Sequence, residues 1–317
     1  MIYKKLGKTG ENISLLCLGG HEYLDTGLSR GFNEDMTMAI KPGYIFDGFG
    51  QDARKKLLQA AFDVGINFFD VTQDSEKEAL GRNLKEVKPP YEIFIQTRPE
   101  GMVYTYDPNN TKMADYNLLK NEVHRICQLL QRDHVDFLNF AFMKEALAHD
   151  PEYLAKISHN IASLKKEGLI RYACADTFSG QDTYVRQIEA ACFDLVYINY
   201  NFGDYQSQNK VLPLASEKNM GVITREAFMK GRLFKIADAI GFTDKPTLAR
   251  AAMKWCLNHE AVSALVYGTG KINHLLDAVN TVNNLKLTDE EHAAIDTIRQ
   301  TQLFKEFEAE KTREFLG

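Results

Sequence analysis

Three apolar runs of this chain lead directly to side chains that can hold charge or transfer a proton. Asp70 ends the run 66–70, Arg98 follows the run 93–97, and Lys144 follows the run 140–143. Arginine stays protonated near neutral pH, so Arg98 would pair with Asp70 or bind an anionic group through its two-pronged guanidinium. A lysine in partly apolar surroundings near that arginine favours its neutral form and can act as general base or acid. Asp70, Arg98 and Lys144 are therefore the candidate catalytic residues, with a plain ion pair and a solvated lysine as the alternatives.

The elements that must position these residues are short apolar runs that alternate with amphipathic stretches. Helix-period patterns cover residues 55–64, 117–132, 153–167 and 247–258. Runs rich in Ile, Val, Leu and Phe predict eight strands, at residues 13–18, 66–70, 93–97, 137–142, 169–175, 195–199, 221–224 and 263–267. Strands that alternate with helices indicate parallel βαβ units and most simply a closed (β/α)8 TIM barrel. An open doubly wound sheet is the alternative, but no strand is followed by a G-x-G-x-x-G turn.

In such a barrel the site lies at the carboxyl ends of the strands, where this sequence places acids, bases and amides. His21 and Tyr23 follow the first predicted strand and could bind substrate or supply a proton. Residues 24–51 form a long connection that carries several glycines and aromatic residues, which favours a loop insertion at the pocket wall. An aromatic loop of this kind is also found at residues 99–110.

Length and composition indicate one globular domain over residues 1–317, with a C-terminal helix or tail from residue 288. The net charge of −5 and the lack of a basic stripe argue against nucleic acid as a partner. No run approaches the ~18 apolar residues of a membrane span, and the first residues lack a secretory segment, so we predict a cytoplasmic protein. Five cysteines without a CxxC pair are expected to be reduced core thiols. The histidines show no metal-ligand spacing.

A series of motifs in the correct order resembles the aldo-keto reductase family over nearly the whole chain. Tyr3-Lys-Lys-Leu-Gly-Lys-Thr-Gly10 is similar to the family's opening hairpin, residues 65–70 to its second strand, and Val135-Asp136-Phe-Leu138 to the start of its fourth. Lys230-Gly-Arg-Leu233 and Gly268-Thr269-x-Lys271 resemble two later loops. The resemblance implies a TIM barrel with an N-terminal β-hairpin and long loops at the C-terminal face.

The resemblance also implies a chemistry, namely carbonyl reduction with a nicotinamide dinucleotide, usually NADP, by a Tyr-Lys-Asp-His set. Asp70 matches the aspartate, Arg98 stands at the lysine position and Lys144 at the histidine position. The stretch between Asp70 and Ser75 is three residues shorter than the family's pattern, and the tyrosine has no counterpart there. We expect an oxidoreductase with a non-standard proton donor.

For NADP, the resemblance assigns further residues along an extended cleft. These are Asp176, Thr177 and Tyr197 at the nicotinamide amide, Arg225 at its ring, Gly231 and Leu233 at the diphosphate, Gly268, Thr269 and Lys271 at the ribose phosphate, and Asp277 at adenine.

Three functions agree with these residues. The leading hypothesis is an NADP-dependent oxidoreductase that acts on a small carbonyl or sugar-acid substrate. The second is a non-redox dehydratase or epimerase, in which Lys144 removes a proton next to a carbonyl and Arg98 stabilises the enolate. The third is an NADP-binding protein without catalytic activity on the same barrel.

Overall fold

The computed structural model describes residues 1–20, 37, 40, 51–103 and 106–317. His21, Tyr23 and nearly all of the predicted insertion 24–51 lie outside these residues, so they stay predictions. Within the described part, no helix is long and apolar enough to cross a lipid bilayer. All five cysteines are described and none forms a disulfide, and four of them are buried.

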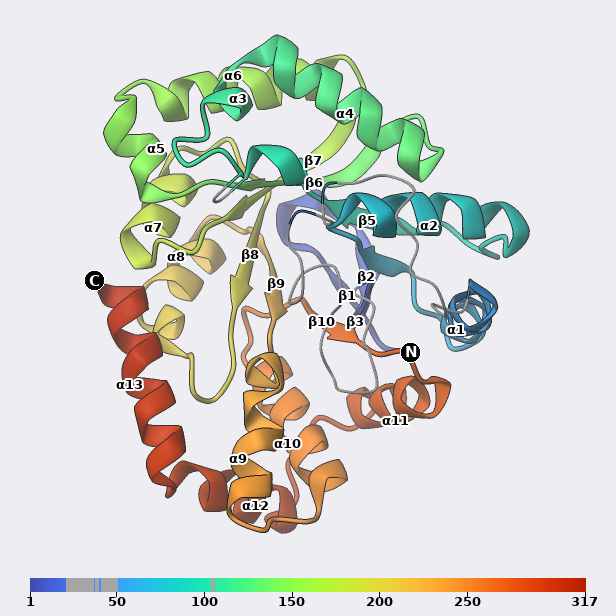
Figure 1. Cartoon of the computed structure of the whole chain (residues 1–317), viewed down its shortest axis with the longest axis vertical. Coiled ribbons are helices and arrows are strands. Elements are labelled where there is room, and N and C mark those ends of the chain that lie inside the picture. Colours follow the sequence, from blue (N-terminus) through green and yellow to red (C-terminus); the bar gives the residue numbers. More distant parts are fainter. Residues whose placement is uncertain (21–36, 38–39, 41–50, 104–105) are drawn as a thin grey trace.

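The eight predicted barrel strands are present and close on themselves, which confirms the TIM barrel and excludes the open sheet (Figure 1). Each strand pairs in parallel with its neighbours, and the ring closes between the last strand and the first. In ring order from the first, they are β3 (Leu16–Gly19), β4 (Phe68–Asp70), β5 (Phe94–Thr97), β6 (Val135–Ala141), β7 (Ile170–Asp176), β8 (Leu195–Asn199), β9 (Gly221–Arg225) and β10 (Ala264–Gly268).

The predicted strand 13–18 is wrong in one respect, because the chain divides it in two. β1 (Tyr3–Lys5) and β2 (Asn12–Ser14) form an antiparallel hairpin, and β3 begins only after Leu15. The bend is held by Ser14, whose hydroxyl donates to the carbonyl of Leu16 at 2.6 Å. Leu6 and Ile13 of the hairpin join the apolar cluster inside the barrel, so the hairpin closes its amino-terminal end. A Cβ on Gly7 would stand 2.3 Å from the backbone nitrogen of Gly221, so this contact requires glycine.

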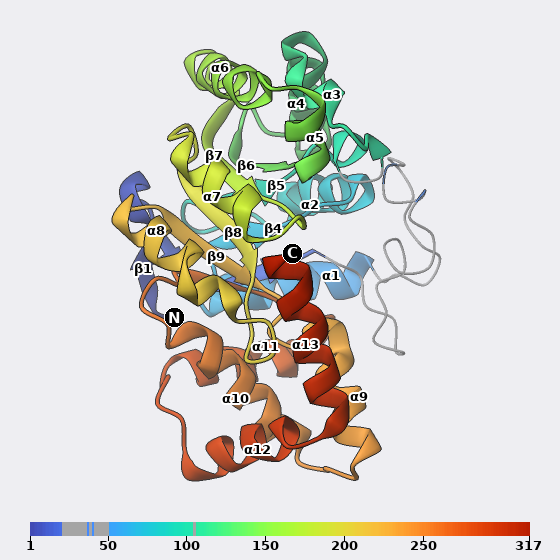
Figure 2. The same ribbon diagram turned by 90° about the vertical axis from the view of Figure 1, so that its left-hand side faces the viewer.

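Helices surround the barrel on its outside (Figures 1 and 2). The predicted helices correspond to α1 (Gln51–Asp63), α4 (Tyr116–Leu130), α6 (Tyr153–Lys166) and α10 (Lys245–Leu257). The other helices are α2 (Asp74–Glu86), α3 (Thr111–Ala114), α5 (Lys144–His149), α7 (Gln181–Glu189), α8 (Val211–Glu217), α9 (Arg232–Ala239), α11 (Ile272–Val282), α12 (Asp289–Arg299) and α13 (Gln302–Leu316). α12 starts with a capping box at the point where the C-terminal helix was expected, because Thr288 and Glu291 exchange side-chain to backbone hydrogen bonds.

Side chains inside the barrel form two layers because successive residues of a strand point to opposite faces. The lower layer is apolar and includes Phe68, Phe94, Phe137, Leu195 and Ile223. Two residues further along the same strands, the inward positions become polar. This change from apolar to polar at the same level of most strands defines the candidate site.

Candidate active site

The inward side chains at the carboxyl ends of β4 to β9 are joined in a buried polar network, which we call the mouth network. Its members are Asp70, Gln96, Asn139, Asp176, Tyr197, Asn199 and Arg225. Six of them lie two residues beyond an inward residue of the apolar layer, for example Gln96 after Phe94 and Arg225 after Ile223, and Asn199 lies two residues beyond Tyr197. The strand alternation therefore brings residues from distant parts of the chain onto one level of the barrel.

Asp70 is the acid at one end of this network, and it is 7% exposed. Its Oδ1 accepts a hydrogen bond from Gln96 Nε2 at 3.2 Å, and its Oδ2 accepts one from the Tyr197 hydroxyl at 2.9 Å. β4 and β8 are four positions apart in a ring of eight, so the Tyr197 side chain reaches across the barrel. Burial, and next the Asp70 charge, raise the pKa of Tyr197 well above that of a free phenol. The phenol is therefore protonated at neutral pH.

Asp176 and Arg225 form the other end of the network as a bidentate ion pair. Arg225 Nη1 and Nη2 donate to the two carboxylate oxygens of Asp176 at 2.9 and 2.8 Å. Asn139 and Tyr184 also donate to this carboxylate, at 3.1 and 3.3 Å. Four donors of the chain thus surround an acid that is fully buried. A buried carboxylate needs such partners because its desolvation costs several kcal/mol otherwise.

Arg225 connects the two ends of the network. Its guanidinium carbon lies 4.4 Å from the ring centre of Tyr197 and 4.7 Å from that of Phe178, and its Nε donates to Asn199 Oδ1 at 2.6 Å. A cation against an aromatic face is attracted by the ring electrons. Arg225, which was expected to stack on the nicotinamide ring, therefore packs against two aromatic rings of the protein itself.

The two amides of the network have fixed orientations. Gln96 and Asn139 each donate their NH2 group to a carboxylate, which can only accept. Their carbonyl oxygens, Gln96 Oε1 and Asn139 Oδ1, are buried and have no hydrogen-bond partner among the residues that the structure describes. Buried acceptors of this kind are satisfied by water or by the donor groups of a ligand.

The structure corrects the expected surroundings of two predicted catalytic residues. Arg98 is buried at the end of β5, but its Nε and Nη2 donate to both carboxylate oxygens of Glu100, two residues away. The two hydrogen bonds described at Asp70 come from other residues. Lys144 is exposed rather than partly dry, because β6 ends at Ala141 and Lys144 starts α5 outside the strand. Its backbone N–H donates to Ser179 Oγ at 2.8 Å.

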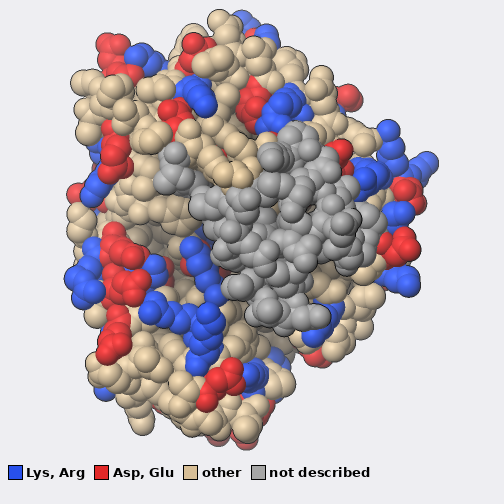
Figure 3. All heavy atoms as spheres, in the orientation of Figure 1, with Lys and Arg blue, Asp and Glu red and all other residues tan. Residues whose placement is uncertain are grey.

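The predicted phosphate-binding loops differ from the mouth network in being open. Gly231 has a φ of +81°, and a Cβ there would meet nothing within 4 Å, as also at Gly270. Lys230 has a φ of 53° and a side chain that is 63% exposed. Lys271 is exposed and caps the N-terminus of α11. Figure 3 shows Lys and Arg side chains gathered on the described surface beside the mouth, in the region of α9.

The other residues predicted to bind the cofactor differ in their burial and contacts. Thr177 is buried and its hydroxyl oxygen accepts from the Ser179 N–H at 2.9 Å. Leu233 is fully buried in the apolar cluster of α9, so only its backbone faces the loop. Gly268 ends β10, and Thr269 follows it as a buried residue.

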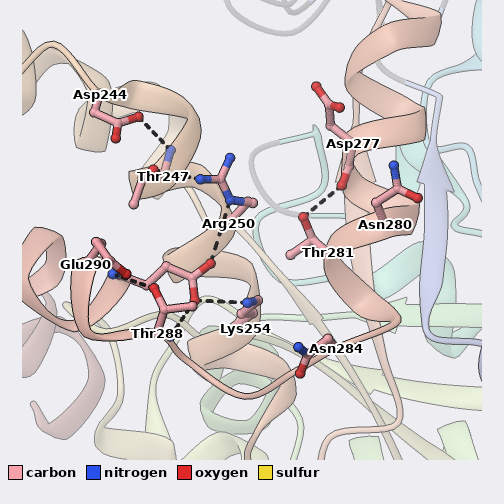
Figure 4. Close-up of a pocket in the computed structure, with 11 residues that line it drawn as sticks. Asp244, Thr247, Arg250, Lys254, Asp277, Asn280, Thr281, Asn284, Thr288 and Glu290 are labelled. Atoms are coloured by element: carbon pink, nitrogen blue, oxygen red, sulfur yellow. Dashed lines mark hydrogen bonds and ion pairs between the residues drawn. The ribbon is translucent and has the colours of Figure 1, made fainter.

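Asp277 lines a groove of about 600 Å3 between α10, α11 and the start of α12 (Figure 4). It stands on α11 with Thr281, whereas Thr247, Arg250 and Lys254 come from α10. Arg250 and Lys254 both pair with Glu291 across the floor of this groove.

The sequence did not single out Gln96, Asn139 or Glu100. The signal for the first two is local, since each is a polar residue at an inward position of an apolar strand. For Tyr197, the sequence indicated a place near the cofactor but not the contact with Asp70, 127 residues away in the chain.

The protein is a closed parallel eight-stranded barrel whose strands end in polar side chains, next to glycine-containing loops that carry lysines. This is the architecture of TIM-barrel enzymes, which have their active sites at the carboxyl ends of the strands. The model of the aldo/keto reductase family matches residues 37–300, and this chain belongs to that family, which is a family of oxidoreductases.

Three similar proteins agree with this assignment. An uncharacterized oxidoreductase of Schizosaccharomyces pombe is 24% identical over 255 residues, which is 79% of this chain and 80% of that protein. A D-threo-aldose 1-dehydrogenase of a Pseudomonas species is 23% identical over 62% of this chain and 65% of its own length. The solved holo form of an aldo-keto reductase from Bacillus halodurans superposes with a TM-score of 0.69 at 19% identity, covering 94% of this chain and 96% of its own. At that identity, the superposition shows the fold alone.

Proposed function

We propose that this protein is an NADP-dependent oxidoreductase that interconverts a carbonyl and an alcohol on a small, polar, sugar-like substrate. One observation carries the proposal. Asp70, which matches the aspartate of the family's catalytic set, accepts a hydrogen bond from the phenolic hydroxyl of Tyr197 at 2.9 Å, although the family's own tyrosine has no counterpart in this sequence. The pair lies at the carboxyl ends of the strands, where barrel enzymes hold their substrates.

The described loops fit the phosphate groups of NADP. Lys230 and Gly231 are part of a turn with several left-handed residues, among them Glu226 and Met229. Such backbone is costly, by roughly 1–3 kcal/mol per residue, and is concentrated at ligand-binding turns. Lys271 stands at the first turn of α11, whose free N–H groups and dipole favour a phosphate. We place the adenine end in the groove of about 600 Å3 that Asp277 and Thr247 line.

At the nicotinamide end, the chain's residues fit less directly. Asp176 accepts hydrogen bonds from Arg225 and from two other residues, Asn139 and Tyr184, so its first role is to hold the guanidinium in place. The Thr177 hydroxyl still has its own proton to donate, because the hydrogen bond described at its oxygen is one that it accepts. The cofactor, when bound, supplies a hydride; the protein's residues position the reacting carbonyl and exclude water from it.

The substrate that suits this mouth is hydroxylated and neutral. Gln96 Oε1 and Asn139 Oδ1 are buried hydrogen-bond acceptors without a described donor, and the hydroxyl groups of a sugar could donate to them. The fork of Arg98, which suggested an anionic substrate, already holds Glu100. The Pseudomonas relative is an aldose dehydrogenase by name, which agrees with a sugar.

Titration with NADPH, followed by protein fluorescence, tests the first part of the proposal. We expect binding in the micromolar range, and weaker binding of NADH. Oxidation of a panel of aldoses with NADP, compared with the matching sugar acids, tests the second part. Absence of NADPH binding at micromolar concentration would contradict the proposed function.

A second candidate is an NADP-binding protein without catalytic activity. The saturated Asp176–Arg225 pair favours it, because that pair stands where the nicotinamide amide and ring are expected. This candidate predicts tight NADPH binding without turnover of any carbonyl or alcohol in the panel. The non-redox enzyme has no such support, since its proposed base, Lys144, is exposed.

A further inference from the structure

The hydroxyl of Tyr197 donates a hydrogen bond to Asp70, the residue that matches the family's aspartate. Tyr197 lies on β8, whereas the family's tyrosine follows the strand that ends in the aspartate. The stretch after Asp70 is too short to carry the usual tyrosine, and the described hydroxyl on Asp70 belongs to Tyr197 of β8. The resemblance assigns Tyr197 to the nicotinamide end of the cofactor cleft. In the structure its long side chain reaches Asp70 on the opposite side of the barrel.

We propose that Tyr197 supplies the proton to the carbonyl oxygen of the substrate in place of the missing tyrosine. The inference rests on the proposed function. The nicotinamide cofactor, when bound, would supply a hydride to the carbonyl carbon, so that the electron pair of the C=O bond would move to oxygen. That oxygen takes the phenolic proton of Tyr197, which forms the alcohol and leaves a phenolate. The phenolate then takes a proton from water, and the reverse sequence oxidises an alcohol.

The groups around Tyr197 act on its hydroxyl in opposite directions. Burial and the Asp70 charge raise the pKa of Tyr197, so the phenol keeps its proton at neutral pH, whereas Arg225 lowers that pKa and so favours release of the proton. The phenolate that forms afterwards needs a nearby cation, and Arg225 lies 4.4 Å from the ring centre. Arg225 is held there by Asp176, which fixes the distance and orientation of the positive charge. Arg225 and Asp176 therefore act as positioning residues, in the place of the family's lysine and its partner.

Replacing Tyr197 by phenylalanine removes the proton and keeps the ring. We expect kcat for carbonyl reduction to fall by about 100-fold or more, the usual contribution of a general acid. KM and the NADPH Kd should change by less than about threefold. Tyr153→Phe is the matched control, because Tyr153 is equally buried and donates one hydrogen bond, to the carbonyl of Asn110 at 3.1 Å, outside the barrel on α6. Its kcat should stay within about twofold of wild type.

A fluorinated tyrosine at position 197 tests the proposal even where the phenylalanine variant folds poorly, since it keeps the hydroxyl and makes it more acidic. The basic limb of the pH–rate profile should move to lower pH. In the cofactor-free protein, the fluorine NMR signal should titrate above the value of the free amino acid, and Asp70→Asn should lower it. The charged or titratable groups that act on this hydroxyl are Asp70, Arg225 and Cys17.

The outcomes separate the two proposals. If wild type turns over and Tyr197→Phe keeps more than about a third of kcat, Tyr197 is not the donor and the proposed function stands. The donor role is also overturned if Asp70→Asn leaves the pKa measured from the fluorine signal unchanged. If wild type binds NADPH but reduces no carbonyl, the proposed function fails, and the donor role fails with it.

Discussion

The mouth network and the loops after β9 and β10 belong to one predicted site, yet they are built in opposite ways. Asp70, Tyr197, Asp176 and Arg225 are buried and bonded to one another. Lys230, Gly231, Gly270 and Lys271 are largely open to solvent. Phosphate recognition needs only backbone N–H groups and mobile cations, so the loops can persist with little packing. Chemistry at the strand ends depends on side chains that fit together, so a single changed residue there requires changes in its neighbours.

The largest effect is expected from opening the buried ion pair. Arg225→Met leaves Asp176 without two of its donors, and breaking such a pair costs about 3–5 kcal/mol. The free energy of unfolding, measured with urea, should fall by that amount. Lys245→Met, which removes an exposed pair with Asp238, should cost less than about 1 kcal/mol. If both variants lost a similar free energy of unfolding, the buried Arg225–Asp176 pair would contribute no more to stability than the exposed Lys245–Asp238 pair.

The loop after β8, where Asp204 lies, should make the stability of the protein depend on pH. Burial, and then the charge of Glu226, raise the pKa of Asp204 from 3.8 to about 7. The native state thus holds this proton more tightly than the unfolded chain, so stability is greatest below pH 4 as far as Asp204 is concerned and falls as pH rises toward 7. We expect a loss of roughly 2–4 kcal/mol over this range. Asp204→Asn should flatten that part of the stability–pH curve; an unchanged slope would contradict the assignment.

A smaller effect is expected at the open loops. Lys271→Ala should weaken NADPH binding by about 10- to 100-fold, because a hydrogen bond to a charged group contributes roughly 1.5–3 kcal/mol. NADH binding should change little, since NADH lacks the ribose phosphate. Lys235→Ala, an exposed lysine on α9, serves as the control for net charge. Equal losses for both nucleotides would place Lys271 elsewhere in the cleft.

The smallest effect is expected at Lys144. Its exposed side chain at the start of α5 should tolerate alanine, with kcat within about twofold of wild type. A fall of more than about tenfold would show that Lys144 takes part in the reaction and would revive the non-redox mechanism. Steady-state kinetics on the best substrate of the panel would decide.

Particular elements show how far the sequence reached. β8 matches its prediction at both ends, because the run 195–199 is apolar and bounded by polar residues. β3 was assigned too early, since the hydrophobic pattern of 13–18 does not record the bend at Ser14. Lys144 was expected in dry surroundings because β6 was extended to residue 142, one residue beyond its end. Arg98 was expected to pair with Asp70 or to bind an anion, and the contact described in the structure is with Glu100, which is close in the chain but follows the strand end.

The order of apolar runs and helix-period stretches was enough to predict the barrel and the strand ends at which the site lies, since these follow from local periodicity, whereas the hairpin was expected only from the family resemblance. The pairing of Tyr197 with Asp70 and of Arg225 with Asp176 was decided only by closure of the barrel. Closure sets which inward side chains face each other across the interior, and that distance depends on ring order and strand tilt rather than on separation along the chain.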